Sequence, residues 1–160
     1  MARYKFNPSV ALRDLYRLLC AFMSLEAVKS LHGGNSEDPL HQLQELYAQD
    51  EIVHLLISTA TMQRVHSDSM RSYREDPGEL WSQEPSRVCG ELQVEDRHSE
   101  PLKLREACNK IIHATSIEIF DWANPVLRLE GTLGQRSWTA FVEINDYVRA
   151  SVENLEDATA

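Results

Sequence analysis

Cysteine is scarce in this chain, which argues against a small protein held together by disulfide bonds. The 160 residues include three cysteines, Cys20, Cys89 and Cys108, and no two of them form a C-x-x-C pair. A disulfide framework uses an even set of cysteines, and disulfides are rare where the cell keeps thiols reduced. We therefore expect a reducing, cytoplasmic setting.

Long apolar runs are also missing, which argues against a membrane protein. The first residues are basic and an apolar stretch follows, as in a signal peptide, but Arg13, Asp14 and Arg17 interrupt that stretch. A helix that crosses a bilayer needs roughly 20 consecutive apolar residues, and no run approaches that length. We expect no export signal and no membrane partner.

Positive charge is the third scarcity. The chain has 16 Lys and Arg residues against 25 Asp and Glu residues, so its formal net charge is −9. An acidic protein repels nucleic acids unless its basic residues gather on one face. Here the basic residues are scattered singly, without a Lys-rich or Arg-rich run. This composition disfavours a nucleic-acid partner.

Sequence signatures of nucleotide binding and of serine hydrolases are absent as well. The chain contains no G-x-x-x-x-G-K-[ST], no G-x-G-x-x-G and no G-x-S-x-G, and its "GTLGQR" is typical of a hairpin turn. We therefore expect no bound cofactor. A length of 160 residues with 42% hydrophobic and 26% charged residues is ordinary for one globular domain, which we expect to span residues 1–160.

Two helices are predicted at the start of the chain. Asn7 can cap a first helix that Gly33 ends, and Asp38 can cap a second helix that begins at Pro39. The short link between them predicts an antiparallel helical hairpin over residues 8–67. The first helix has an apolar side made of Leu15, Leu18, Leu19, Phe22 and Leu25. The second has an apolar side, expected to face the core, made of Leu43, Leu46, Tyr47, Val53, Leu56, Ile57 and Ala60.

A polar connection is expected over residues 67–101. It is punctuated by proline and glycine and has little periodicity, although Val88–Val94 predicts a short strand. Trp81 is expected to anchor the connection to the rest of the domain.

The C-terminal third of the chain mixes helix and strand patterns. A third helix is predicted over residues 102–114, and residues 116–144 alternate apolar and polar side chains around a turn that contains Gly131 and Gly134. Asn145 can cap a short terminal helix over residues 145–155. The expected fold class is α+β, mainly α: a helical hairpin, a third helix, a small antiparallel β-hairpin or sheet and a terminal helix.

The third predicted helix carries the strongest chemical pattern. At about 100° per residue, Leu104, Ala107, Cys108 and Ile111 form its apolar side. A separate stripe, with one helical turn between neighbours, is made of Arg105, Asn109 and His113. We expect this stripe to face away from its own domain, where it is either solvated or meets a partner.

The run "CNKIIH" within this helix resembles the motif region of HEPN helical domains, which belong to prokaryotic toxin–antitoxin and defence systems. Their motif places an arginine, the polar residue after it and a histidine four residues later on one late helix. Asn109 matches the polar residue and His113 matches the histidine, while Cys108 stands where the motif has arginine and Arg105 lies one turn before Asn109. The longer string "LREACNKIIHA" is similar to segments of small bacterial proteins.

The resemblance implies a metal-independent ribonuclease whose site forms between two subunits. In such a site, a histidine moves the proton of the ribose 2′-hydroxyl or protonates the leaving oxygen, and an arginine stabilises charge at the phosphate. The catalytic residues that the resemblance implies here are His113 as general acid or base and Asn109, which orients it. Arg105 as a substitute for the motif arginine is an inference from helix geometry and is not part of the family pattern.

A metal site is a further possibility to weigh. Glu51-x-x-His54 and Glu95-x-x-His98 both have the spacing that di-iron bundles use for paired ligands. However, Glu95 and His98 lie in poor helix sequence, and although Glu26 could be a third ligand, no fourth is evident. We therefore interpret these pairs as ordinary surface residues and expect no metal.

The leading hypothesis from sequence is a small, acidic, bacterial or phage interaction or regulatory protein without enzymatic activity. It would bind a protein partner or a second copy of itself through its acidic helical surface, or through the face of Arg105, Asn109 and His113 in a homodimer. The alternative is the HEPN-like ribonuclease, and only this alternative includes RNA as a partner. An enzyme predicts that the three residues converge in a cleft, whereas an interaction protein predicts a larger exposed apolar or acidic face elsewhere.

Overall fold

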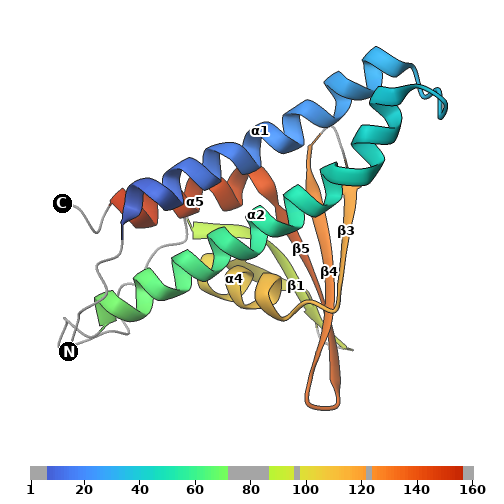
Figure 1. The fold of residues 1–160 in the computed structure, drawn as a ribbon. Helices are drawn as coiled ribbons and strands as arrows, with labels where there is room; N and C mark the ends of the chain where they lie inside the picture. Colours follow the sequence, from blue (N-terminus) through green and yellow to red (C-terminus); the bar gives the residue numbers. More distant parts are fainter. Residues whose placement is uncertain (1–6, 72–86, 96–97, 122–123, 157–160) are drawn as a thin grey trace.

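The protein has an α+β fold in which helices cover one face of a five-stranded sheet (Figure 1). The computed structural model describes residues 7–71, 87–95, 98–121 and 124–156. Its helices are α1 (Pro8–His32), α2 (Pro39–Arg71), α4 (Leu104–His113) and α5 (Ile144–Glu156). Its strands are β1 (Val88–Val94), β2 (Glu100–Lys103), β3 (Ser116–Asp121), β4 (Val126–Leu133) and β5 (Arg136–Glu143).

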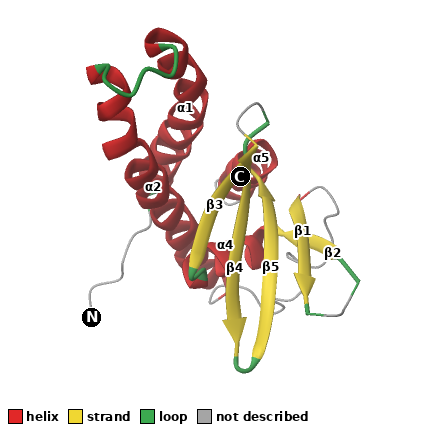
Figure 2. Ribbon diagram, turned by 90° about the vertical axis from the view of Figure 1, so that its right-hand side faces the viewer, coloured by secondary structure: helices red, strands yellow, loops and turns green. Residues whose placement is uncertain are grey.

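The sheet has the strand order β2-β1-β5-β4-β3, and every neighbouring pair is antiparallel. Helices α4 and α5 pack against one face of it, and the α1–α2 hairpin packs on those two helices (Figure 2). The alternation along β4 and β5 turns their apolar side chains toward the helices. The buried residues of this face are Leu127, Leu129, Trp138, Ala140 and Val142.

The hairpin begins and ends where the capping residues predict. The Asn7 side chain accepts a hydrogen bond from the Ser9 N–H at 3.0 Å, and that of Asp38 accepts one from the Leu40 N–H at 2.8 Å. Gly33 follows α1 in the left-handed region, with φ of 58°, which a residue without a side chain adopts readily. These local interactions confirm the predicted starts of both helices.

The hairpin is longer than the layer it packs on, so its distal part projects beyond the sheet (Figures 1 and 2). We call this part, residues 23–50, the arm. Leu25 and His32 are buried within it, but no residue of the fully described stretch from Gly33 to Glu51 is buried. At the tip, the Gly34 N–H donates to His32 Nδ1, so His32 Nε2 carries the hydrogen that it donates to Gln44 Oε1 at 2.9 Å.

The predicted core side of the second helix is partly wrong. Leu56 and Ala60 are buried, as expected, but four of the other residues are exposed, namely Leu43, Leu46, Tyr47 and Ile57. The reason is geometric: these four side chains point outside the sector of α2 around Leu56 and Ala60 that faces the core. Helix α2 therefore carries two apolar stripes.

Element boundaries differ from the predictions at three places. Helix α2 extends to Arg71, beyond the predicted end at residue 67. Strand β1 spans Val88–Val94 as predicted. Strand β2, which pairs with β1, was not predicted. Because β2 occupies residues at the predicted start of the third helix, α4 begins only at Leu104. Trp81 lies outside the described residues, so its anchoring role stays a prediction.

Gly131 and Asn145 also have other roles than predicted. The turn of the β4–β5 hairpin contains Gly134, whereas Gly131 lies inside β4 beneath the Trp138 ring, where a Cβ atom would approach Trp138 Cζ2 to 2.2 Å. Buried Lys110 lies on the same ring, with its Nζ 4.4 Å from the ring centroid. Asn145 is the second residue of α5 instead of its cap, because the helix already begins at Ile144.

Candidate functional site

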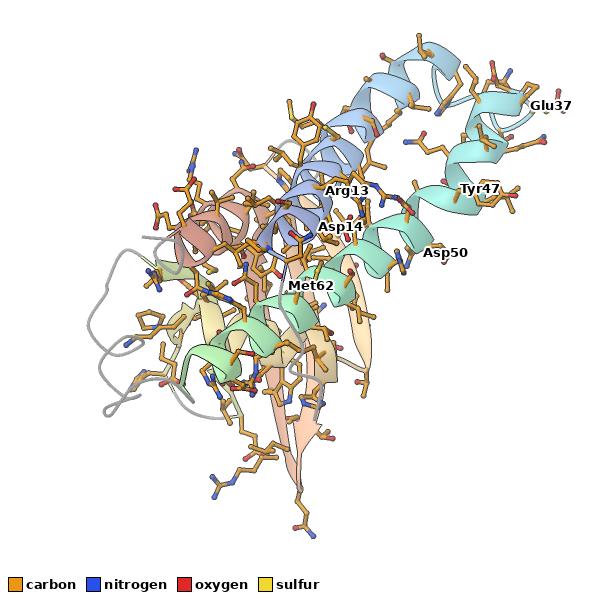
Figure 3. All side chains as sticks on the ribbon, turned by 60° about the vertical axis from the view of Figure 1, so that its left-hand side comes forward. Arg13, Asp14, Glu37, Tyr47, Asp50 and Met62 are labelled. Atoms are coloured by element: carbon orange, nitrogen blue, oxygen red, sulfur yellow. The ribbon has the colours of Figure 1, made fainter. Side chains whose placement is uncertain are left out.

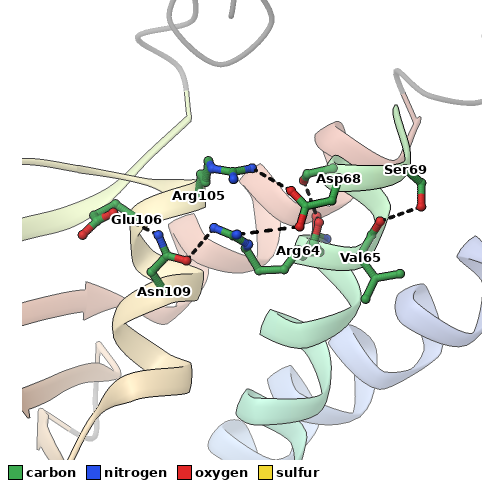
Figure 4. A network of polar contacts seen from close by, with 9 residues as sticks. Arg64, Val65, Asp68, Ser69, Arg105, Glu106 and Asn109 are labelled. Atoms are coloured by element: carbon green, nitrogen blue, oxygen red, sulfur yellow. Dashed lines mark hydrogen bonds and ion pairs between the residues drawn. The ribbon is translucent and has the colours of Figure 1, made fainter. Parts of the chain in front are cut away.

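Helix α4 turns Arg105 and Asn109 toward the C-terminal part of α2 (Figure 4). Arg64 Nη1, from α2, donates to Asn109 Oδ1 at 2.5 Å, and Asn109 Nδ2 donates to Glu106 Oε2 at 3.1 Å. Both polar atoms of the Asn109 amide are thus engaged in contacts within the domain. The expectation that this residue faces away from its own domain is wrong.

Asp68 completes this network from the α2 side. Its Oδ1 accepts a hydrogen bond from Arg105 Nη1 at 3.3 Å, and its Oδ2 lies 3.7 Å from Arg64 Nη2. One carboxylate therefore contacts two guanidinium groups, which compensates part of their positive charge. The network joins two helices that are distant in sequence, and this gives Arg105 and Asn109 a structural role.

His113 is the last residue of α4 and is exposed. Within the described part of the chain, its side chain forms no hydrogen bond or ion pair with the network around Asn109. The structure therefore brings Arg105 and Asn109 together through α2 and leaves His113 outside that group. Arg64 is the residue that sequence reasoning missed, because its position 45 residues before Asn109 gave no hint of contact.

Cys108, at the position of the motif arginine, faces the core. It is 1% exposed, and burial raises the pKa of its thiol to about 12. Burial likewise raises the pKa of the Cys89 thiol well above its ordinary value, and the neighbouring Cys108 adds to this shift. A thiol that stays protonated at neutral pH is a poor nucleophile, so neither buried cysteine suits covalent catalysis.

The two Glu-x-x-His pairs do not form a metal site in the structure. Glu51 Oε1 accepts a hydrogen bond from Arg17 Nη2 at 2.5 Å, and Glu95 Oε1 accepts one from the Ser137 N–H at 3.2 Å. Over the described ranges, no three His, Cys, Asp or Glu side chains come together as potential metal ligands. These glutamates instead join α1 to α2 and β1 to β5.

The exposed apolar residues gather on the hairpin. Among the described residues, eleven large hydrophobic side chains are exposed, and all but Leu133 belong to α1 or α2. Those on α1 are Val10, Tyr16, Met23 and Leu31. Those on α2 are Leu40, Leu43, Leu46, Tyr47, Ile57 and Val65. Single exposed apolar residues are common, but here they are concentrated on one structural unit.

The exposed residues of α2 follow a regular pattern along the side opposite its buried stripe. Asp50 lies on the side of α2 that is turned away from α1 (Figure 3), and Tyr47 borders the surface that α2 shares with Cys20 and Ser24 of α1. Counting in alternate steps of three and four residues from Leu40 gives a set that we call the outer seam. It consists of Leu40, Leu43, Tyr47, Asp50, His54, Ile57 and Thr61, and all seven are exposed. This spacing places the set on one face of the helix, as in a coiled coil.

Two cavities lie along the other side of the hairpin. One, of about 340 Å³, is lined by residues of both helices near the tip, including His41 and Glu45. The second, of about 240 Å³, lies between the hairpin and Ile117 and Ile119 of the edge strand β3. The two share Leu25, Ala48 and Gln49 among their lining residues, so they adjoin each other, and we call the pair the groove.

The acidic character of the protein is pronounced along the tip of the hairpin and the N-terminal part of α2. From Glu37 to Gln63 the chain carries five acidic residues and no Lys or Arg. The acidic residues are Glu37, Asp38, Glu45, Asp50 and Glu51. Only Glu51 has an ion pair with an α1 residue, Arg17, among the contacts of this stretch. The arm is thus apolar and negatively charged at once.

Comparison with known proteins adds no family assignment to this geometry. No protein-family model, curated protein or solved structure matches the chain significantly. Among the helices that the structure describes, none combines the length and the hydropathy needed to cross a membrane. The candidate surface is therefore identified by its own residues: an apolar, acidic helical hairpin that projects from a compact α+β body.

Proposed function

We propose that the protein is a non-enzymatic interaction protein whose hairpin binds another protein chain. The observation that carries this proposal is the position of the exposed large hydrophobic residues in the part of the chain that the structure describes, where all but one of them lie on α1 and α2. Their exposure costs solvation free energy in the isolated chain, at about 25 cal/mol for each Å² of apolar surface. A partner that covers them recovers that free energy.

Two further features support a binding role for the hairpin. The arm projects beyond the sheet, so both of its helices are accessible from several sides (Figure 1). The groove beside Leu25 and Ala48 adds a concave surface next to the edge strand β3. An apolar centre with polar or charged surroundings is the usual composition of a protein-binding surface.

Site-specific photocrosslinking in cells tests the proposal. A photoreactive amino acid at Leu46 or Leu31, on the exposed sides of the two helices, should give discrete crosslinked protein products. The same probe at Glu153, which is exposed on α5, is the matched control and should give none. Equal products at all three positions, or none at any, would contradict a binding role for the hairpin.

A metal-independent ribonuclease is the second candidate, and Arg64 favours it. The hydrogen bond from Arg64 to Asn109 puts a guanidinium beside α4, where position 108 carries a buried cysteine instead of the motif arginine. In this candidate function, His113 is the general acid or base, and Arg64 stabilises charge at the phosphate. Its weakness is Asp68, which already contacts the same guanidinium.

Cleavage of labelled RNA in EDTA tests this second candidate. The wild-type protein is compared with His113→Ala and with Arg149→Ala, which removes an exposed arginine of α5 and serves as the control. Cleavage that is lost in His113→Ala and kept in Arg149→Ala would support the ribonuclease. Equal inactivity of all three proteins would eliminate it and leave the interaction role.

A further inference from the structure

The outer seam of α2 has the residue spacing of a coiled-coil interface. Its seven residues alternate steps of three and four over three helical repeats, and each is exposed in the structure. Most of the seam is apolar or small, but its centre is polar, with Asp50 and His54. A partner of this helix must therefore satisfy a carboxylate and an imidazole in the middle of an otherwise apolar contact.

We infer that the partner of the outer seam is α2 of a second copy of this chain, packed antiparallel. This inference rests on the proposed function and names the partner. A two-fold axis at the centre of the seam puts Asp50 of each copy against His54 of the other. The same register puts Tyr47 against Ile57 and Leu43 against Thr61. Each layer then contains one a-type and one d-type residue, as antiparallel coiled coils require.

Charge complementarity selects the antiparallel orientation. In a parallel pair, identical residues meet, so that Asp50 would face Asp50 and His54 would face His54. Two carboxylates at the centre of a helix interface repel each other. In the antiparallel pair, each Asp50 carboxylate accepts an N–H from a His54 ring, and an imidazole has such a donor in its neutral and its charged form.

The same two residues select the register. Sliding one helix by a full heptad in one direction puts Asp50 against Tyr47 and His54 against Leu43. Sliding it in the other direction puts His54 against Ile57. Either shift leaves a polar group against an apolar one, which costs free energy when water is excluded. Polar seam residues are known to specify coiled-coil register in this way.

The structure accommodates this arrangement at the ends of the seam. Leu46, 64% exposed, flanks Tyr47 and extends the apolar contact. At the other end, the register puts Leu40 against Arg64, whose charge Asp68 and Asn109 hold toward α4. The exposed apolar residues of α1, such as Met23 and Leu31, and the groove beside β3 stay outside this interface and remain accessible to a different protein.

Charge exchange at the centre of the seam tests the inference. Sedimentation equilibrium should give a dimer for the wild-type protein. Asp50→Lys removes both central pairs, and His54→Glu turns both into repulsive pairs, so each variant should raise the dissociation constant at least about tenfold. An equimolar mixture of the two variants should restore the dimer. In the mixed dimer, the lysine introduced by the first substitution faces the glutamate introduced by the second, while the unchanged His54 of one copy faces the unchanged Asp50 of the other.

Crosslinking between single cysteines tests the register. In a Cys20→Ser background, a short bifunctional thiol reagent should join Tyr47→Cys to Ile57→Cys in a mixture of the two proteins. A mixture of Tyr47→Cys with Glu153→Cys is the control and should give no product. Products from Tyr47→Cys alone at equal yield would contradict the antiparallel register.

The outcomes separate this inference from the proposed function. Self-association through the seam is overturned if the wild-type protein is a monomer. It is also overturned if the mixture of Asp50→Lys and His54→Glu stays monomeric while the circular dichroism of each variant shows that its helices are folded. Photocrosslinks from Leu46 to a different protein would then still support the interaction role. Absence of crosslinks from the hairpin would overturn both.

Discussion

In the body of the molecule each element turns its apolar residues to one side, whereas in the hairpin the helices carry apolar residues on two sides. Leu129 in β4 and Ile111 in α4 are about 1% exposed or less, and the neighbours of Leu129 in sequence, Arg128 and Glu130, are polar. In α2, by contrast, Leu56 is fully buried and Leu46 is 64% exposed. The body therefore buries its hydrophobic residues, whereas the outer sides of the hairpin leave them exposed, as the proposed contact with other chains requires.

The sharpest way to test this contrast is to truncate matched leucines of α1. Leu18 is fully buried and Leu31 is 71% exposed. Leu18→Ala should lower the free energy of unfolding by about 2–5 kcal/mol, because it leaves a cavity in the core. Leu31→Ala should change it by about 0.5 kcal/mol or less. Urea unfolding measures both, and similar losses for the two variants would contradict a separation between folding and contact residues.

A second test probes how tightly the body is packed around Trp138. Gly131→Ala introduces a Cβ that would lie 2.2 Å from Trp138 Cζ2, so it should destabilise the protein by roughly 1–3 kcal/mol. Combining it with Trp138→Phe, which shortens the ring system, should cost less than the sum of the two single changes. Strict additivity in thermal unfolding would show that the ring and Gly131 do not interact.

The buried thiols of the body predict a loss of stability in alkaline solution. The pKa of Cys108 rises from 9.0 to about 12 on folding, so the unfolded chain releases this proton at lower pH than the folded one. This contribution to stability is complete below pH 9 and falls as pH rises toward 12, by about 1 kcal/mol per pH unit. Unfolding at pH 8 and pH 10 measures it, and Cys108→Ala should show a shallower decline.

The smallest effect is expected at the junction of α2 and α4. Asn109→Ala removes the acceptor of Arg64 and the donor to Glu106, both partly exposed, and should cost about 0.5–1.5 kcal/mol. Hydrogen exchange should accelerate in α4 and leave the arm unchanged. Acceleration in the arm as well would mean that the arm depends on this network.

The two sides of α2 also show where sequence reasoning succeeds and fails. Asn7 and Asp38 cap their helices as predicted, because a cap depends on residues only two or three positions away. The exposure of Leu43 and Tyr47 was not predicted, because an apolar residue at helical spacing has the same pattern whether it meets the core or a partner. The heptad spacing of the outer seam is present in the sequence. It was not recognised, because α2 has apolar residues at many other positions as well.

The candidate catalytic stripe illustrates the same limit. The helix and its apolar side were predicted from local periodicity, and Cys108 and Ile111 are buried as expected. The partner of Asn109 is Arg64, which is 45 residues away, and no pattern within α4 indicates it. Contacts between distant segments depend on how the helices cross, which local propensity does not determine.

The sequence by itself determined the class of this protein and most of its elements: an acidic α+β chain whose hairpin, β1 strand and β4–β5 hairpin follow from caps, glycines and alternation. Only the tertiary structure decided which apolar stripe of α2 is buried, and that Arg105 and Asn109 hold two helices together. The physical reason is that capping and periodicity act over a few residues, whereas burial depends on which surfaces the rest of the fold covers.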